Sequence, residues 1–304
     1  MNLNTALLRL LVFPGLLFAV PAAWLFLWME RKAVALMQQR MGPPFLQPCF
    51  DFTKLMGKSA PARQGINGAF MRAWPILSVA ASVGALGLLP VFLRSSGFPG
   101  DLILLIALLE LPSFFIIAAG YTSRSLYGEI GSAREAVLSI SYNVVFVTAI
   151  LAIALSQHSF RLQDLAQNPA SPLRLLGVLA IVVCIPAKLH INPFSLPNAE
   201  QEIYSGPMTE YAGPELALWE ISHGLEWVAM TGLVASLVLP RTGLWWADTL
   251  LFIVISTGIV LLLSALAAAT ARLTVDSSVR FYWRCGLAVA VLAGLSALYL
   301  RMGL

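Results

Sequence analysis

The sequence predicts an all-α fold, a polytopic protein whose helices cross a bilayer about eight times. Hydrophobic residues make up 59% of the 304 residues, charged residues only 11%, and the mean hydropathy is +0.81. Soluble domains carry about a quarter of charged residues. Long apolar runs recur along the chain without a fixed-period repeat or a low-complexity tract, which favours a single membrane domain over residues 1–304.

Each predicted span is near the roughly 20 residues that a bilayer requires. The first run follows a single basic residue, Arg9, and lacks a small-residue cleavage site, so a retained helix is expected rather than a signal peptide. In chain order the spans are Ala6–Met29, Trp74–Leu93, Asp101–Gly120, Ala136–Ser156, Leu173–Leu189, Leu216–Leu239, Trp245–Ala269 and Cys285–Leu300.

The distribution of Lys and Arg predicts the orientation. Most of these residues lie in the connections after the first, third, fifth and seventh spans. By the positive-inside rule these connections face the cytoplasm, and both termini face the outer side. The long cytoplasmic connections are then 30–72, 121–135 and 190–215, an asymmetry that suits a protein on which something large docks from the cytoplasm.

The sequence argues against a nucleic-acid-binding function and against a metal site or disulfide framework built from cysteines. The pI near 9.1 does not indicate a nucleic-acid partner, because the basic residues sit at the ends of apolar runs, where topology requires them. The cysteines Cys49, Cys184 and Cys285 are far apart and form no CxxC motif, so they indicate neither a metal site nor a disulfide framework. We expect no cofactor on this chain.

The first and third connections carry weaker patterns. The first helix is expected to continue to about Arg40 and to break at Gly42-Pro43-Pro44. Phe45–Leu55 then fits a short amphipathic helix at the interface, or equally a basic loop attracted to anionic lipid. In 121–135, small residues alternate with charges, which permits close backbone approach and ion pairs but also fits a solvated turn.

The stretch 192–215 organises the chain. It contains four prolines, two glycines and four acids, and long apolar runs flank it. Carboxylates beside hydrocarbon are costly unless they line a wet or protein-filled cavity, and irregular backbone at that depth needs the same surroundings. We predict that this stretch forms the wall of a buried polar chamber; the alternative is an ordinary acidic loop in water. The acids are Glu200, Glu202, Glu210 and Glu215.

Ionisable residues also occur within the predicted spans. Glu110 is in the middle of the third span, and Glu220, His223 and Glu226 are in the sixth. At about 100° per residue the last three fall within an arc of about 120°. A carboxylate inside the membrane is a functional-site hypothesis by default, and a line of acids leading to an acidic chamber favours proton conduction over purely structural hydrogen bonding.

Several motifs together resemble one family. They resemble those of the membrane subunit that joins the two arms of respiratory complex I and of its energy-converting hydrogenase relatives. The resemblance covers nearly the whole chain. The segments that carry it are Glu30-Arg31, Arg40–Pro43, Leu46–Pro48, Asp51–Leu55, Gly131–Glu135, Pro193–Ile203 and Glu210–Gly213.

The details resemble the hydrogenase branch more closely. The run between Gly42-Pro43 and Leu46-Gln47 is short, and Gly206-Pro207 resembles the membrane subunit of formate hydrogenlyase. The resemblance implies a membrane anchor and proton-path subunit in the inner membrane of a prokaryote. It implies hydrogenase-like large and small subunits on the cytoplasmic side, which would hold the NiFe centre and iron–sulfur clusters, together with antiporter-like membrane subunits and lipid.

Three other functions stay open. One is the quinone-chamber subunit of complex I, and another is a structural anchor that moves no protons. A stand-alone transporter predicts internal repeats, which the sequence lacks. The anchor alternative draws support from neutral residues at positions where the family usually has acids: Ser195, Asn198 and Asn143. Their side chains hydrogen-bond water but cannot carry a proton near neutral pH.

The resemblance and the residue patterns together define two sets of site residues. For the proton path they are Glu110, Glu135, Glu200, Glu202, Glu210, Glu215, Glu220, His223 and Glu226. For docking and the chamber they are Glu30, Arg31, Arg40, Asp51, Lys54, Arg134, Pro193, Phe194 and Tyr211.

Overall fold

The computed structural model describes residues 16–61, 63, 65–90, 98–157, 159–167, 172–238, 245–291 and 294–295. The predicted all-α class is confirmed, since this part of the chain contains helices and no strand. The helices are α2 (Leu16–Met37), α3 (Gln47–Met56), α4 (Gly65–Leu88), α5 (Asp101–Ser123), α6 (Leu126–Ser156), α7 (Leu162–Gln167), α8 (Pro172–Lys188), α9 (Glu200–Ile203), the 3-10 helix η1 (Gly206–Glu210), α10 (Pro214–Val238), α11 (Trp245–Ala269), α12 (Val275–Phe281) and the π-helical turn η2 (Tyr282–Gly286).

Five helices of the described part are long and apolar enough to cross a membrane: α4, α5, α6, α10 and residues Ala247–Ala269 of α11. α2 and α8 occupy two further predicted spans, but α2 carries Glu30, Arg31 and Lys32, and α8 has only 17 residues. The first and last predicted spans extend beyond the described residues. The count of eight and the orientation therefore stay predictions.

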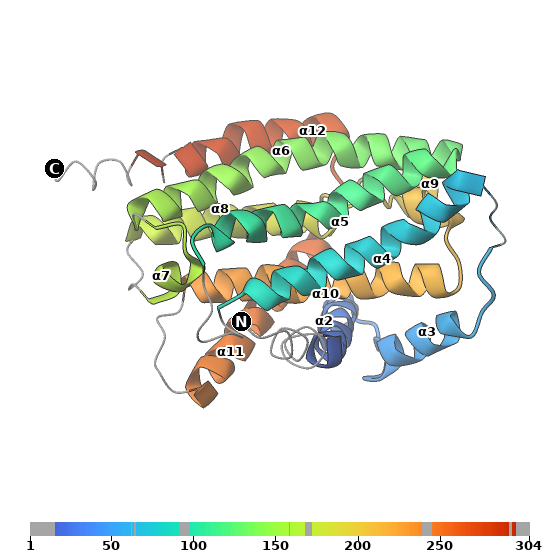
Figure 1. The fold of residues 1–304 in the computed structure, drawn as a ribbon, viewed down its shortest axis with the longest axis horizontal. Coiled ribbons are helices and arrows are strands. Elements are labelled where there is room, and N and C mark those ends of the chain that lie inside the picture. Colours follow the sequence, from blue (N-terminus) through green and yellow to red (C-terminus); the bar gives the residue numbers. More distant parts are fainter. Residues whose placement is uncertain are drawn as a thin grey trace.

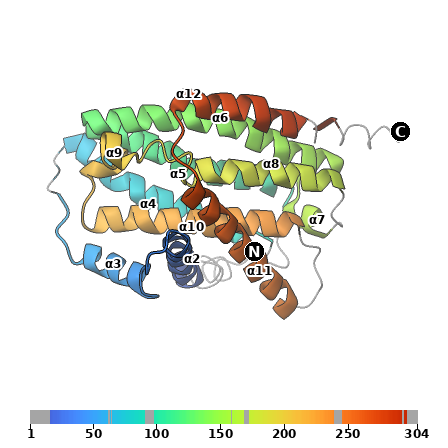
Figure 2. The same ribbon diagram turned by 180° about the vertical axis from the view of Figure 1, so that it is seen from behind.

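α10 lies at the centre of the bundle (Figures 1 and 2). Within the most apolar window of each candidate span, 89% of α10 is buried, against 33% for α11 and 56% for α6. It packs against α2, α4, α8 and α11. Because α10 is buried on nearly all sides, any ionisable side chain on it faces protein or an internal cavity.

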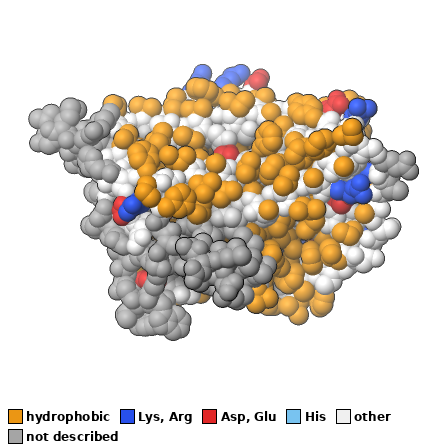
Figure 3. Space-filling view, in the orientation of Figure 1, with side chains coloured by type: hydrophobic (Ala, Val, Ile, Leu, Met, Phe, Trp, Pro, Cys, Tyr) orange, Lys and Arg blue, Asp and Glu red, His pale blue; other side chains and the backbone are white. Residues whose placement is uncertain are grey.

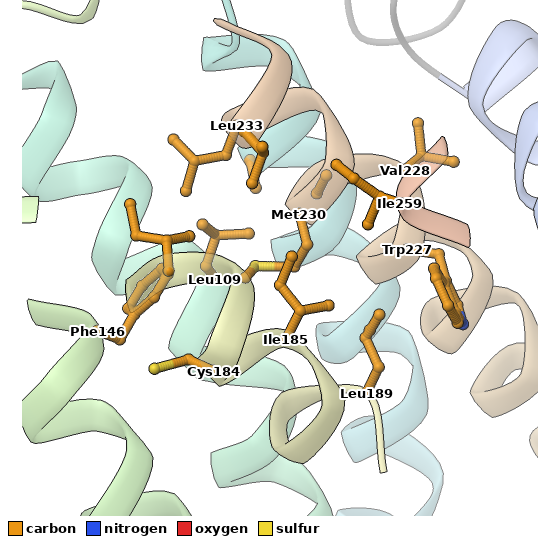
Figure 4. Close-up of a cluster of buried hydrophobic side chains, with 14 of the residues drawn as sticks. Leu109, Phe146, Cys184, Ile185, Leu189, Trp227, Val228, Met230, Leu233 and Ile259 are labelled. Atoms are coloured by element: carbon orange, nitrogen blue, oxygen red, sulfur yellow. The ribbon is translucent and has the colours of Figure 1, made fainter. Parts of the chain in front are cut away.

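The packed interior around α10 is a cluster of large apolar side chains. Leu109 of α5, Ile185 of α8 and Met230 and Leu233 of α10 belong to it (Figure 4). On the outer faces of α4, α5 and α6, apolar side chains instead form a broad exposed surface (Figure 3). Such a surface suits contact with lipid.

The first connection folds back on α2. Lys32 donates to the carbonyl of Met41 at 2.7 Å, and the indole of Trp28 donates to the carbonyl of Pro43 at 3.3 Å. Gly42 lies between them with a φ of +62°, which glycine adopts without strain. The helix predicted for Phe45–Leu55 is present as α3. Of the two alternatives for this segment, a short helix and a basic loop, the structure therefore shows the helix.

The third connection is shorter than expected. The predicted connection 121–135 is helical except for Arg124 and Ser125, which separate α5 from α6. The reason is close packing: a Cβ on Gly120 would meet the Ser132 hydroxyl and the Gly128 carbonyl. Small residues thus let the two helices approach each other, as the sequence pattern permits, and leave little chain for a loop.

Candidate functional site

A cavity of about 170 Å³ lies beside the first half of α10. A water needs roughly 10–15 Å³ of such volume, so several waters fit, and polar walls can hold them. The walls come from α5, η1, α10 and the connection before α9. The lining residues are Ile116, His190, Asn198, Met208, Leu216, Trp219, Glu220, His223 and Glu226.

The acids and the histidine of α10 form one line along this cavity. Glu220, His223 and Glu226 all line it, as expected of residues within one arc of a helix. Glu226 is only 4% exposed. It lies about 18 Å along the helix axis from Pro214, at 1.5 Å per residue. Ionisable groups therefore extend from near the start of α10 into the bundle.

A buried pair adjoins the cavity. Nε2 of His190 lies 2.9 Å from Oε2 of Glu135, and both side chains are at most 5% exposed. Burial on its own lowers the pKa of His190, but the Glu135 carboxylate, and more weakly that of Glu226, favour the imidazolium, so the pKa is raised overall. His190 thus joins the cavity to α6.

A second buried pair connects α8 to α5. Nζ of Lys188 donates to Oε1 of Glu110 at 2.8 Å, and the Lys188 side chain is 0% exposed. The ammonium also lies 5.5 Å from the ring centroid of Tyr142 and 5.9 Å from that of Phe146, a cation–π arrangement. No sequence pattern predicts this pairing, because the two residues are 78 positions apart in the sequence.

The end of the 192–215 stretch is held by Arg63. Its guanidinium donates to the carboxylate of Glu215 and to the backbone carbonyl of Glu210, and lies 4.9 Å from the ring centroid of Tyr211. Burial raises the pKa of the Tyr211 hydroxyl. Glu215 therefore pairs with Arg63 and is not among the residues that line the cavity. Sequence reasoning missed Arg63, which stands in no recognised motif.

The remaining predicted acids lie outside the cavity wall. Glu202 is exposed and accepts from Arg134 at 2.6 Å, and Glu210 is exposed. Glu200 begins α9, but its side chain is not among the described ones. Of the described side chains in the stretch 192–215, only Asn198 and Met208 reach the cavity.

The predicted docking residues divide into a surface group and an interior group. On the surface Asp51 accepts from Arg31 at 3.2 Å and from Gln47 at 2.8 Å, and the bond from Arg31 joins α2 to α3. In the interior, Pro193 and Phe194 are buried, and Phe194 packs against the rings of Phe281 and Tyr282. Others of the set are half-buried or exposed: Glu30, Arg40 and Lys54.

Together, the long apolar helices and the half-open cavity lined by Glu220 and Glu226 define a polytopic membrane protein with ionisable groups inside its bundle. The chain belongs to the NADH dehydrogenase family, whose model matches residues 10–297. This confirms the family that the motifs predicted.

Relatives come from both branches of that resemblance. The chain is 33% identical over 225 residues to hydrogenase-4 component C of Escherichia coli (strain K12), and the match covers 71% of this chain and 70% of that protein. It is 28% identical over 286 residues to the H-type subunit of NADH-quinone oxidoreductase from Brevibacillus brevis, covering 87% and 84% respectively. A chain of the membrane-bound sulfane sulfur reductase, an archaeal respiratory membrane complex, superposes with a TM-score of 0.88 at 26% identity, covering 96% of this chain and 99% of that one.

Replacing Arg63 with Ala is expected to destabilise the protein by about 2 kcal/mol. The substitution removes the two hydrogen bonds that the guanidinium donates and its contact with the Tyr211 ring. The loss is smaller than for a pair at the centre of the bundle, since Glu215 lies in the first turn of α10, where the helix N-terminus favours negative charge. Thermal unfolding would measure it. Arg134→Ala, which removes a more exposed pair, should change stability by less than about 1 kcal/mol. Equal effects of the two substitutions would contradict the holding role of Arg63.

The His190–Glu135 pair predicts a pH dependence of stability. The pKa of His190 is raised above its ordinary value of 6.5, so its contribution to stability is present in full below that value. The contribution is lost as the pH rises through the raised pKa. The difference in melting temperature between the wild type and His190→Gln should therefore shrink towards alkaline pH. A difference that grew with pH would show that the imidazole is held neutral.

Proposed function

We propose that this chain is the membrane anchor and proton-path subunit of an energy-converting, membrane-bound hydrogenase-like oxidoreductase complex. The observation that carries the proposal is the line of Glu220, His223 and Glu226 along a half-open cavity, with His190 and Glu135 beside it. Carboxylates and imidazoles both accept and release protons. Waters in a cavity of this size can connect them.

The arrangement supports a route with two parts. Glu220 lies nearer the start of α10, and it lines both the large cavity and a small void beside Arg31. Glu226 is deeper, and Glu135 with His190 faces it from α6 and the connection after α8. In the proposed route a proton enters at Glu220 and passes by water to Glu226. Lys188 and Glu110 do not line the cavity, and in this proposal they would receive the proton in the direction of α5.

The proposed partners follow from the relatives. Similarity to hydrogenase-4 component C supports partners from a hydrogenase complex. On the motif resemblance, we propose that these are hydrogenase-like large and small subunits on the cytoplasmic side and antiporter-like subunits in the membrane. In this proposal the NiFe centre and iron–sulfur clusters belong to those partners, and the complex sits in the inner membrane of a prokaryote. The relatives have three different names, hydrogenase, quinone oxidoreductase and sulfane sulfur reductase. The partner's chemistry is therefore set outside this chain.

A quinone-chamber subunit is the second candidate, favoured by the larger coverage of the match to the NADH-quinone oxidoreductase relative. Quinone dependence separates the two. We expect electron transfer by the purified complex to persist in lipid stripped of quinone and to be insensitive to quinone-site inhibitors. Activity that disappears on stripping and returns with added quinone would assign the chain to the quinone branch. Subunit composition before and after stripping serves as the control for damage.

A further inference from the structure

A second hollow lies at the end of the bundle where α4 begins and α5 ends. Its volume is about 420 Å³, and it opens broadly to the outside. It is lined by Asn67, Phe70, Trp74, Tyr121, Thr122 and Arg124. None of these residues belongs to the cavity beside α10, and none is among the predicted site residues. We propose that this hollow binds the headgroup of an anionic phospholipid.

The position of the hollow places it at the membrane–water interface. α4 and α5 are both candidate spans, and the start of α4 and the turn from α5 to α6 lie at the same end of the bundle (Figures 1 and 2). Just beyond, the outer faces of α4 and α5 are apolar (Figure 3). A lipid whose acyl chains lie along that surface would bring its headgroup to the hollow.

The lining supplies a cation and an aromatic wall. Arg124 is charged, and the described residues that line the hollow include no acid. Trp74 stacks between Phe70 at 5.6 Å and Phe115 at 5.7 Å, measured between ring centroids. Trp and Tyr are enriched at this depth of a membrane, and basic pockets between transmembrane helices are known to bind anionic headgroups.

The side chains are fixed before any ligand arrives. With the amide of Asn67 turned to face it, Oδ1 accepts from Nη2 and Nε of Arg124 at 3.2 and 3.1 Å. The indole of Trp74 donates to the hydroxyl of Thr122 at 3.3 Å. These hydrogen bonds connect α4 to the end of α5 and fix the orientation of the polar side chains in the hollow. Binding a headgroup then costs less side-chain conformational entropy.

The backbone at Arg124 is a separate observation. Arg124 ends α5 with a φ of +55°, in the left-handed region that favours glycine at this position. A long cationic side chain at a position where the backbone favours glycine suggests that the side chain itself has a functional role there. A guanidinium binds phosphate through paired hydrogen bonds. In the hollow, this role for Arg124 would be to bind the phosphate of the headgroup.

The test uses the purified, delipidated complex that contains this chain. Native mass spectrometry and the melting temperature would follow titration with phosphatidylglycerol, with phosphatidylethanolamine and with inorganic phosphate. We expect phosphatidylglycerol to bind and to raise the melting temperature. Arg124→Gln should weaken that binding about tenfold, the loss of one charge-assisted contact. Arg72→Gln, which alters an exposed arginine of α4 that does not line the hollow, should bind as the wild type does.

Arg124→Gly separates binding from folding, because glycine suits the backbone there: it should lose the lipid while the complex assembles normally. Wild-type binding in both Arg124 variants would overturn the proposal, as would equal binding of phosphatidylethanolamine. An equal rise in melting temperature with inorganic phosphate would overturn it in favour of a site for a free anion. Absence of bound lipid in the wild type would overturn it too, and would indicate that another chain covers the hollow.

Discussion

Lys188→Met should destabilise the protein by about 3 kcal/mol, because it leaves Glu110 inside the bundle without its cation. Lys188 is 0% exposed and donates to Glu110 at 2.8 Å. Removing one partner of a buried pair costs about 3–5 kcal/mol, and the low end applies because Glu110 is 22% exposed and can gain water. The melting temperature of the purified protein would measure the change.

The double variant Lys188→Met, Glu110→Gln is the internal control. Removing both charges should recover more than half of the lost stability, since a neutral pair needs no charge compensation. Arg134→Met provides a surface control, with an expected change below about 1 kcal/mol. If the double variant were as unstable as Lys188→Met, the loss would come from packing against Tyr142 and Phe146, and the ion pair would not be the cause.

Composition and periodicity predict much of this structure because they report on local physics. Apolar runs of span length predict the helices α4, α5, α6, α10 and α11. A 3.6-residue period places Glu220, His223 and Glu226 on one face, and the structure puts all three on the cavity. The end of the first helix is predicted less well, because α2 ends at Met37, with Gln39 at a φ of +59°, before the expected Arg40 and the break at Gly42-Pro43-Pro44.

Pairings between distant segments could not be predicted in the same way. Arg63 is 152 positions from Glu215, and Lys188 is 78 from Glu110. Neither pair leaves a spacing signal, since only the packing of the helices brings the residues together. Lys188 also fits another explanation, a charge at the end of a span. Its burial follows from the position of α8 against α6 and α10.

Motif membership identifies the family correctly but does not say what each motif residue touches. Phe194 stands in the signature loop and in the set predicted for docking and the chamber, and the structure shows that it packs on Phe281 and Tyr282 in the interior. Glu215 shares a helix face with Glu226 by spacing, but Arg63 holds it away from the cavity. His190 stands in no predicted set, although it lines the cavity beside Glu135.

Proton translocation is expected to depend more on Glu226 than on Glu220. Glu226 is 4% exposed, so bulk water has little access to it and a proton cannot easily pass around it. Glu220 stands nearer the start of α10, so water can bypass it. Glutamine keeps the shape and hydrogen bonding of glutamate but cannot carry a proton. In proteoliposomes, Glu226→Gln should abolish most of the pH gradient, and Glu220→Gln should reduce it partially.

Electron transfer and subunit composition, measured on the same preparations, show whether the variants still assemble. Glu129→Gln is the matched control, because this exposed carboxylate of α6 does not line the cavity and belongs to neither predicted set, so its loss should leave the gradient at the wild-type size. A gradient of wild-type size in Glu226→Gln, in Glu220→Gln and in the double variant would make both acids structural. The neutral residues Ser195, Asn198 and Asn143 would then support the alternative that this chain is a structural anchor that moves no protons. A gradient lost only in variants with Glu226→Gln would place the essential carrier in the middle of α10, at the residue that faces His190 and Glu135.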